Sequence, residues 1–296
     1  MVRALRIFEE VGEDWAFDRF ARALDDQLET PAELLAYAEL MAAERKPHLA
    51  VRAGKTARRT GFSVPAVTYP LVPVPDRAAG FVEAPLILGL SRQESEFNPR
   101  AYSSARAQGL MQLLDSTARL TARKEGIAYQ RELLMDDPAY NMTLGAAHLS
   151  HLIERFEGSY VMTLAGYNAG PHRVTTWIEE YGDPRDPSVD IVDWVELIPF
   201  SETRNYVQRV LENVQIYRAR LGGGPIAGRL TDDLTRGGGR ASSIANDVPA
   251  PRLVEVAATG ARADALNVPG TLPAAMNASF PTLHDAPVPS VKPQEG

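Results

Sequence analysis

Apolar side chains recur at the spacing of an α-helix along most of the first 221 residues, and no segment shows the sustained alternation of a β-strand. Near the start of the chain, one such stripe consists of Phe17, Phe20, Leu24 and Leu28. A second helix is predicted from Thr30, because Thr30 can cap it, Pro31 suits its first turn and Glu33 can reach back to the Thr30 amide. We expect two or three short helices in residues 1–63.

The second of these helices should bury one face. The positions assigned to that face are Leu34, Leu35, Ala38, Leu40 and Met41. Two or three amphipathic helices are too small to build a large core by themselves. Residues 1–63 are therefore predicted to be the last part of a helical stack, or a pad that packs on the following domain.

The next segment is rich in proline. The prolines between positions 64 and 85 are Pro65, Pro70, Pro73, Pro75 and Pro85. Proline is excluded from helix interiors and also restricts the residue before it to extended conformations. Residues 64–84 are therefore predicted to be an extended connector and not a helix.

Helical periodicity returns at residue 85. The predicted helices cover about 86–94, 116–125, 139–156, 159–168, 171–181 and 202–221. The last of them has Ser201 as its expected N-cap and keeps one face apolar. That face comprises Tyr206, Val207, Val210, Leu211, Val214, Tyr217 and Leu221. Residues 85–221 are predicted to form an all-α domain.

The composition changes after Leu221. Residues 222–296 contain 10 Gly and 9 Pro but a single aromatic residue, Phe280. Such a segment has too little apolar surface to offset the entropy lost on folding. We predict a disordered tail, and the pattern does not require a binding partner for it.

Overall composition excludes several function classes. The 31 Lys and Arg against 38 Asp and Glu give a net charge of −7, which is unlike a protein that binds nucleic acid phosphates. No apolar run approaches the roughly 18 residues of a membrane span. The absence of Cys excludes disulfides, Cys-ligated metals and a thiol nucleophile. The residues after Met1 lack the apolar core of a signal peptide, so taken alone they predict either a cytoplasmic protein or a start that is not the true one.

Few of the usual catalytic motifs are present. His148 and His151 are three positions apart, but no acidic residue completes a metal site beside them, and a solvated helix face is the favoured interpretation. The chain has neither a G-x-S-x-G elbow nor a phosphate-binding glycine loop. Metal, acyl-serine and nucleotide chemistry are therefore not expected.

Glu94 stands out because it ends an apolar helix. The negative end of a helix dipole disfavours an ionised acid, and an apolar lining would add to this effect. Together they would raise the pKa of Glu94 and keep it protonated near neutral pH, as a general acid requires. The alternative is an ordinary helix-end glutamate that is paired with Arg92 or Arg100.

Two further motifs combine side-chain amides with glycine. Gly109-Leu110-Met111-Gln112 and Gly166-Tyr167-Asn168-Ala169-Gly170 would each let a ligand approach the backbone closely. Tyr167 offers a flat apolar face with a hydroxyl at its tip, which suits a sugar ring. Taken separately, each motif is better explained by a structural role.

In combination, these motifs resemble a known family. Residues of about 68–221 are similar to the catalytic domain of soluble lytic murein transglycosylases, whose fold is like that of goose-type lysozyme. The matching motifs, in the family's order, are Gln93-Glu94-Ser95 with Asn98-Pro99, Gly109-Leu110-Met111-Gln112, Tyr167-Asn168-Ala169-Gly170, and Ile198-Pro199-Phe200-Ser201-Glu202-Thr203-Arg204 with Tyr206. Residues 1–63 resemble the end of the family's helical superhelix, most of which this chain would lack. The resemblance implies a periplasmic location, because a signal peptide would be missing along with the superhelix.

The resemblance implies an activity and a set of site residues. The family cleaves the β-1,4 bond between N-acetylmuramic acid and N-acetylglucosamine of peptidoglycan without water and leaves a 1,6-anhydromuramoyl end. Glu94 would act first as the acid and then as the base, and neither a cofactor nor a metal is implied. The residues expected to line or support the cleft are Ser95, Gln112, Tyr167, Asn168, Glu202 and Tyr206. For Glu202, an alternative is that it only complements the dipole of its helix.

Three positions depart from the family pattern. Leu114-Asp115 replaces a common Met-Pro, Arg106 stands near a usual glycine, and Gly166 replaces an alanine. Asp115 either caps the next helix or faces the cleft as a second carboxylate that permits some hydrolysis. Two other functions stay open: a lysozyme-like hydrolase on the same fold, and a catalytically silent scaffold that binds the cell wall.

Overall fold

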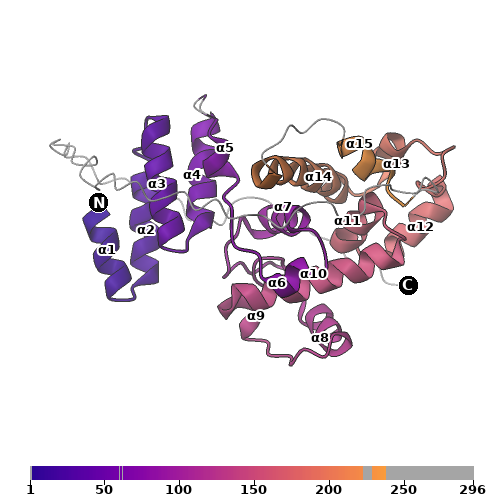
Figure 1. Cartoon of the computed structure of the whole chain (residues 1–296), viewed down its shortest axis with the longest axis horizontal. Coiled ribbons are helices and arrows are strands. Elements are labelled where there is room, and N and C mark those ends of the chain that lie inside the picture. Colours follow the sequence, from indigo (N-terminus) through magenta and orange to yellow (C-terminus); the bar gives the residue numbers. More distant parts are fainter. Residues whose placement is uncertain (1, 60, 62, 223–228, 238–296) are drawn as a thin grey trace. The chain divides into compact units, whose positions relative to one another are not determined.

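The computed structural model describes residues 2–59, 61, 63–222 and 229–237, and this part of the chain is helical (Figure 1). Its only β-type pairings are two isolated bridges, Tyr102 with Gln108 and Gln108 with Leu113. None of the described helices combines the length and the apolar character needed to cross a membrane. The predicted all-α fold class is confirmed.

Four helices precede the proline-rich segment: α1 (Val2–Glu10), α2 (Asp14–Asp25), α3 (Pro31–Ala43) and α4 (Pro47–Arg59). The predicted capping box is present, since Glu33 N donates to Thr30 Oγ1 and Thr30 N donates to Glu33 Oε2. The buried residues of this layer, including Leu5, Phe17, Leu34, Met41 and Leu49, form a core of their own.

One residue assigned to the buried face of these helices was assigned wrongly, and one residue of the first apolar stripe is largely exposed. Leu35 is 39% exposed because it directly follows the buried Leu34, and consecutive residues point about 100° apart on a helix. Phe20 is 40% exposed and packs at the surface against Phe8, with 4.8 Å between the ring centroids.

The proline-rich connector contains two short helices, α5 (Pro65–Thr68) and α6 (Asp76–Ala79), so the prediction of a wholly extended segment was wrong. Proline permits both helices because Pro65 occupies the first helical position and Pro75 is the N-cap of α6. Neither position needs a backbone N–H inside the helix.

The catalytic region predicted for 85–221 contains α7 (Ala84–Ser95), α8 (Asp115–Lys124), α10 (Pro138–Arg155), α11 (Tyr160–Ala169), α12 (Pro171–Tyr181) and α14 (Ser201–Gly222). Each lies within two residues of a predicted helix. The short helices α9 (Leu133–Asp136) and α13 (Ile191–Leu197) were not predicted. Ser201 was expected to be the N-cap of the last helix, but it is the first residue inside α14.

Helix α7 lies at the centre of this region and packs most extensively on α14. Leu86, Ile87, Leu88 and Leu90 are almost fully buried, so α7 is buried around its whole circumference until its last turn. The two helices approach closely at Gly89, where a Cβ atom would lie 3.1 Å from the Val214 side chain. A central, rigid helix therefore carries Glu94 at its carboxyl end.

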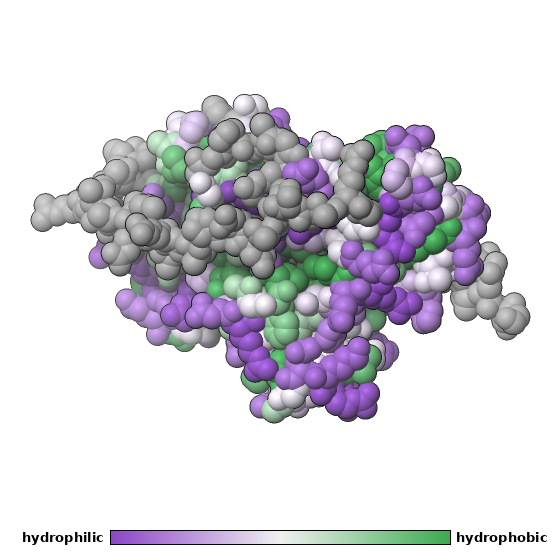
Figure 2. Space-filling model, turned by 45° about the vertical axis from the view of Figure 1, so that its right-hand side comes forward, coloured by the Kyte–Doolittle hydropathy of each residue, from purple (hydrophilic) through white to green (hydrophobic). Residues whose placement is uncertain are grey.

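The space-filling view shows apolar residues gathered in a hollow at the middle of one face, flanked by hydrophilic side chains (Figure 2). This arrangement is typical of a protein whose ligand site lies between the elements of its core.

The segment 222–296, predicted to be disordered, contains one further helix that packs on this domain. Residues Arg229–Thr235 form α15, which contacts α11 and α14. The prediction is therefore wrong for this stretch, which is held by side chains distant in sequence. Residues 223–228 and 238–296 of the predicted tail lie outside the described residues.

Candidate active site

Glu94 lies in the last turn of α7 and is partly buried. Its Oε1 atom accepts a hydrogen bond of 2.6 Å from the hydroxyl of Tyr206. The two arginines proposed as alternative partners are engaged elsewhere. Arg92 donates to Thr68 O and Asn213 Oδ1, and Arg100 lies 3.5 Å from Asp136. Glu94 is therefore not a surface glutamate neutralised by a neighbouring arginine.

The surroundings of Glu94 raise its pKa to about 7. Burial is the largest cause, because it penalises the charged carboxylate. The Tyr206 hydrogen bond lowers the pKa, whereas the nearby negative charge of Glu202 raises it. Near neutral pH, the group is close to an equal mixture of acid and base.

A tight loop after α7 faces the end of that helix. Gly109 has a φ of +75°, and a Cβ atom at this position would come within 2.1 Å of Leu134 O. Gln112 also has a positive φ, +47°, which is an uncommon conformation for a residue with a side chain. Its amide nitrogen donates to Ala101 O and Gly109 O. The loop thus holds the Gln112 side chain in one orientation.

Ser95 connects α7 to the same loop. Its hydroxyl lies 2.7 Å from Leu110 O and 3.2 Å from Ser91 O. One hydroxyl hydrogen cannot serve both carbonyls fully, so the contacts are shared within the protein. In the structure Ser95 is placed to support the loop beside Glu94.

Asn141, on α10, anchors this loop and was missed by the sequence analysis. It is fully buried, its Oδ1 accepts from Met111 N, and its Nδ2 donates to Gln108 O and Leu134 O at 2.8–2.9 Å. A polar residue within the apolar run that follows Pro138 was the one available signal. The bonds to Met111 N and Leu134 O matter most, because buried backbone groups without partners are costly, whereas Gln108 O also accepts from Leu113 N.

Tyr167 and Asn168 come from the end of α11. The Tyr167 hydroxyl donates to Met111 O at 2.8 Å, so this ring joins α11 to the loop. Burial and the nearby charge of Glu94 raise the pKa of Tyr167 well above its ordinary value, and the phenol stays neutral. Asn168 Oδ1 accepts from the Thr203 hydroxyl at 2.6 Å, which places it beside the start of α14.

Glu202 and Tyr206 are both on α14. Tyr206 is buried and contacts Glu94 directly, whereas Glu202 is exposed in the first turn and acts on Glu94 through its charge. The structure therefore brings Glu94 together with Tyr206, Tyr167 and Glu202. It places Ser95, Gln112 and Asn168 in the bonded elements around them.

Asp115 has a different environment from the one proposed for a second catalytic acid. It is the first residue of α8, Leu114 is the N-cap, and the expected capping role is therefore wrong. Its carboxylate accepts from the Tyr129 hydroxyl at 2.5 Å and from Arg119 at 3.2 Å. The Tyr129 hydrogen bond lowers its pKa, so the group is ionised at neutral pH.

His148 and His151 do not form the solvated helix face that was expected. His148 is partly buried and packs on Tyr167, with 5.3 Å between the ring centroids, and burial lowers its pKa to about 4. His151 Nε2 lies 2.6 Å from Glu125 Oε1. Among the residues that the structure describes, no three His, Asp or Glu side chains are grouped as a metal site would require.

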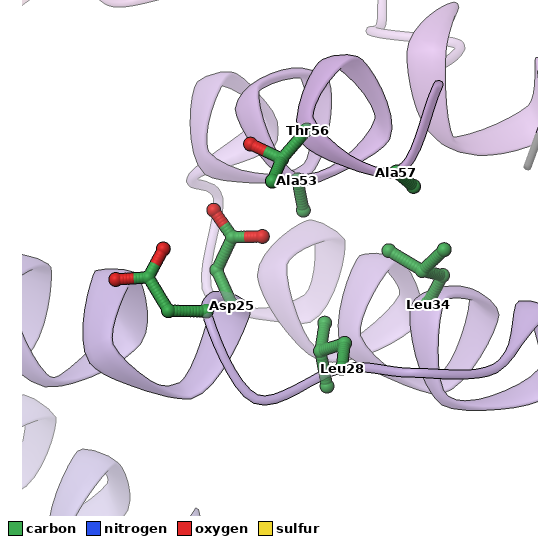
Figure 3. A pocket seen from close by; sticks show the side chains of 7 residues that line it. Asp25, Leu28, Leu34, Ala53, Thr56 and Ala57 are labelled. Carbon is green, nitrogen blue, oxygen red and sulfur yellow. The ribbon is translucent and has the colours of Figure 1, made fainter. Parts of the chain in front are cut away.

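One pocket lies away from Glu94, and a second reaches its chain neighbour Ser95. The first, of about 150 Å³, is enclosed by α2, α3 and α4, and Asp25 points toward Ala53 and Thr56 there (Figure 3). Asp25 is already paired with Arg52 at 3.2 Å. The other pocket, of about 260 Å³, is lined by Arg22, His48, Leu49, Arg52, Ser95, Glu96 and Asn98. Burial also raises the pKa of Asp25, but Arg52 pairs with that carboxylate, whereas no cationic side chain acts on Glu94 among the described residues. The candidate active site is therefore assigned to Glu94.

Comparisons with known proteins cover the part of the chain that contains these residues. Residues 77–188 match the family model of the transglycosylase SLT domain, and residues 197–225 match that of the soluble lytic transglycosylase helical domain. The first match contains Glu94, the loop and the end of α11. The second covers the start of α14 with Glu202 and Tyr206.

Curated relatives include a putative soluble lytic murein transglycosylase from Haemophilus influenzae, which is 43% identical over 124 residues. The soluble lytic murein transglycosylase of Escherichia coli K12 is 37% identical over 139 residues. These matches cover 42% and 47% of this chain but 20% and 21% of the relatives. The matched region thus spans about a fifth of the length of these relatives.

Solved structures give the same result for the fold. The 70 kDa soluble lytic transglycosylase of Escherichia coli has a TM-score of 0.63 and 28% identity, over 74% of this chain and 35% of that one. An inactive mutant of the lytic transglycosylase Slt from Pseudomonas aeruginosa has a TM-score of 0.62 and 32% identity, over 76% of this chain and 36% of that one. The resemblance of this chain to the soluble lytic murein transglycosylases, with their lysozyme-like helical fold, is confirmed.

Proposed function

We propose that this chain is a peptidoglycan lytic transglycosylase that cleaves the β-1,4 bond between N-acetylmuramic acid and N-acetylglucosamine. The observation that carries the proposal is Glu94, a carboxyl group with a pKa raised to about 7 and a single hydrogen bond, to Tyr206, among its described contacts. Such a group can hold a proton at neutral pH and give it to a glycosidic oxygen.

Glu94 serves both halves of the reaction in this proposal. As an acid, it protonates the oxygen that leaves C1 of the muramoyl sugar. As a carboxylate, it then accepts the proton of the C6 hydroxyl while that oxygen bonds to C1 and closes the 1,6-anhydro ring. The proton that Glu94 gives up in the first step is replaced by the one it takes from the C6 hydroxyl, so one carboxyl group is enough. A pKa near the working pH suits both steps.

The substrate supplies the nucleophile, so a second carboxylate is not required. Most glycosidases need one, either to attack the sugar or to activate water. A well-oriented intramolecular hydroxyl can reach an effective molarity of about 10⁵–10⁸ M, which lets ring closure compete with bulk water. Asp115, the candidate second acid, is held by Tyr129 and Arg119 and contributes no hydrogen bond to the group around Glu94.

The other residues around Glu94 have distinct roles in this proposal. Tyr206 orients the carboxyl group, and Tyr167 offers an aromatic face to a sugar ring. Gln112 and Asn168 each keep part of their side-chain amide free to contact hydroxyl or acetamido groups. Ser95 supports the loop, and the charge of Glu202 favours the protonated form of Glu94.

The relatives support the same activity and its setting. The matched proteins are named soluble lytic murein transglycosylases, and the structure from Pseudomonas aeruginosa is of a mutant that is inactive after a Glu-to-Gln exchange. By this likeness we place the chain in the periplasm with peptidoglycan glycan strands as its partner.

Analysis of the product ends tests the proposal against its two alternatives. Purified sacculi are incubated with the full chain, and the released muropeptides are identified by mass spectrometry. A transglycosylase gives muramoyl ends that are one water lighter than reducing ends. Reducing ends would instead show a lysozyme-like hydrolase, and binding to sacculi without any release would show a silent scaffold.

A further inference from the structure

A buried group of charged side chains lies at the ends of three helices that carry the site residues. Arg218, on α14, is only 10% exposed and donates to Glu83, the N-cap residue of α7, and to Asp233 of α15. Asp233 is 2% exposed and also accepts from Gln215 at 2.6 Å. Breaking such a buried, mutually bonded group by removing one partner is strongly destabilising.

Helix α11 and the end of α15 complete this group. The Tyr160 hydroxyl donates to Glu83 Oε1 at 2.8 Å, and the Arg236 guanidinium lies 4.0 Å from the centre of the Tyr160 ring. Burial acts to raise the pKa of Glu83, but the bonds and charge of Arg218 outweigh it and lower that pKa. Glu83 is therefore ionised and tightly held.

Gly237 closes the segment against the turn that precedes α11. It has a φ of +83°, and a Cβ atom there would lie 2.8 Å from Ser159 N and 2.9 Å from Glu157 O. Residues 229–237, which we call the clasp, thus pack on the backbone before α11 as well as on α14 (Figure 1).

The clasp and the active site occupy opposite ends of the same helices. On α7, Glu83 and Glu94 are separated by about 16 Å of helix, at 1.5 Å per residue. On α11, Tyr160 is at the clasp and Tyr167 at the site, and on α14, Arg218 is at the clasp and Tyr206 at the site. If one of these helices slid along another, the contacts at the clasp and the positions of the site residues would therefore change together.

We propose that the clasp sets the longitudinal register of α7, α11 and α14, with Asp233 and Arg218 as positioning residues for Glu94, Tyr167 and Tyr206. The inference concerns the same site as the proposed function and rests on it for its catalytic consequence. Displacements of about 1 Å at a catalytic group can cost roughly 100-fold in rate. The clasp can therefore have a large effect on catalysis although it lies far from Glu94.

Asp233→Asn in the full chain tests this inference, with Asp232→Asn as the matched control. Asp232 is exposed on the same helix and has no ion pair among the described residues. The readout is the titration of the Glu94 carboxyl carbon by NMR, assigned with Glu94→Gln. The groups that act on the pKa of Glu94 are Tyr206 and Glu202 of α14, and the charge of Glu94 in turn acts on Tyr167 of α11.

If the clasp sets the register, Asp233→Asn lets water reach Glu94 and its midpoint falls from about 7 toward its ordinary range. A fall of one pH unit would lower the protonated fraction at pH 7 from about one half to one tenth, and kcat by about fivefold. The control keeps the wild-type midpoint. Gly237→Ala, which leaves every charge in place, should reproduce the shift and serves as the test if Asp233→Asn does not fold.

The inference is overturned if folded Asp233→Asn and Gly237→Ala both titrate at the wild-type midpoint, even if they melt at lower temperature. That result would make the clasp a stability element only. A failure of the proposed function looks different, since the wild-type protein would then release no anhydro ends while the Glu94 midpoint still responded to the clasp.

Discussion

The Tyr206 hydroxyl donates to Glu94 Oε1 across the contact between α14 and α7, and this 2.6 Å bond opposes the effect of burial on the carboxyl group. Burial raises the pKa of Glu94 while the bond lowers it. The balance leaves the group near pH 7, where it can both give and take a proton.

Tyr206→Phe should therefore raise the pKa of Glu94 above about 7, because the bond that stabilises the carboxylate is lost. The alkaline limb of the pH–rate profile, where the acid form disappears, should move to higher pH. We expect kcat to fall about tenfold at the optimum, since the carboxyl group loses its orienting partner. An alkaline limb that stays in place or moves to lower pH would contradict this account.

The raised pKa of Glu94 also makes the stability of the protein depend on pH. In the folded state Glu94 keeps its proton up to about pH 7, whereas an ordinary glutamate releases it near 4.5. The folded state thus binds more protons between these values, and stability falls as pH rises through this window. Relative to Glu94→Gln, the wild-type protein should lose up to about 3 kcal/mol between pH 4.5 and pH 8.

Urea denaturation of both proteins at these two pH values measures the difference directly. Contributions from all other titrating groups cancel between wild type and Glu94→Gln. Parallel pH dependence of the two free energies of unfolding would show that Glu94 is not held in a charge-disfavouring site.

Asn141→Ala should damage both stability and activity. The substitution removes the side-chain partner of Met111 N and of Leu134 O, at a cost of about 2–4 kcal/mol, and it takes one of two bonds from Gln108 O, which also accepts from Leu113 N. It also frees the loop that holds Gln112 and the carbonyl bound by Tyr167. Thr143→Ala is the control, because that hydroxyl bonds only to Ala139 O within the same helix. Equal effects of the two variants in denaturation and turnover assays would refute an anchoring role.

Gly166→Ala should destabilise the protein by about 1–3 kcal/mol, although the family resemblance puts alanine at this position. In this chain a Cβ atom there would lie 2.8 Å from the Phe156 ring. Phe156→Leu should therefore rescue Gly166→Ala in thermal melts, while Gly80→Ala, whose added carbon has its nearest neighbour at 3.4 Å, should be nearly neutral. Absence of rescue would mean that Phe156 is not the obstacle.

Local sequence patterns predicted the main helices and the residue at the centre of the site. The apolar periodicity of α10 and α14 located both helices, and the placement of Glu94 at the end of an apolar run indicated its unusual titration. These features depend on residues that are close together in the chain.

The features that were not predicted depend on partners distant in sequence. Helix α15 is held through Asp233 by Arg218, and Arg218 is held in turn by Glu83, far earlier in the chain. An average over the Gly- and Pro-rich segment could not reveal this seven-residue helix. Leu35 was assigned to the core because apolar character alone does not say which side of a helix is covered.

The sequence indicated some of the left-handed backbone conformations but not others. Arg106, noted because a glycine is usual near its position, does have a left-handed φ of +67°. The left-handed φ values of Glu96 and Phe97, directly after α7, had no such signal, because neither residue type indicates that conformation.

The most direct test of the central claim is the release of muropeptides from sacculi by wild type and by Glu94→Gln, with both proteins shown to be folded by circular dichroism. General acid catalysis contributes about 10²–10⁴-fold, so the variant should keep less than about one hundredth of the wild-type rate, and all wild-type products should carry 1,6-anhydro ends. A variant that keeps more than about a tenth of that rate would show that a different group moves the proton.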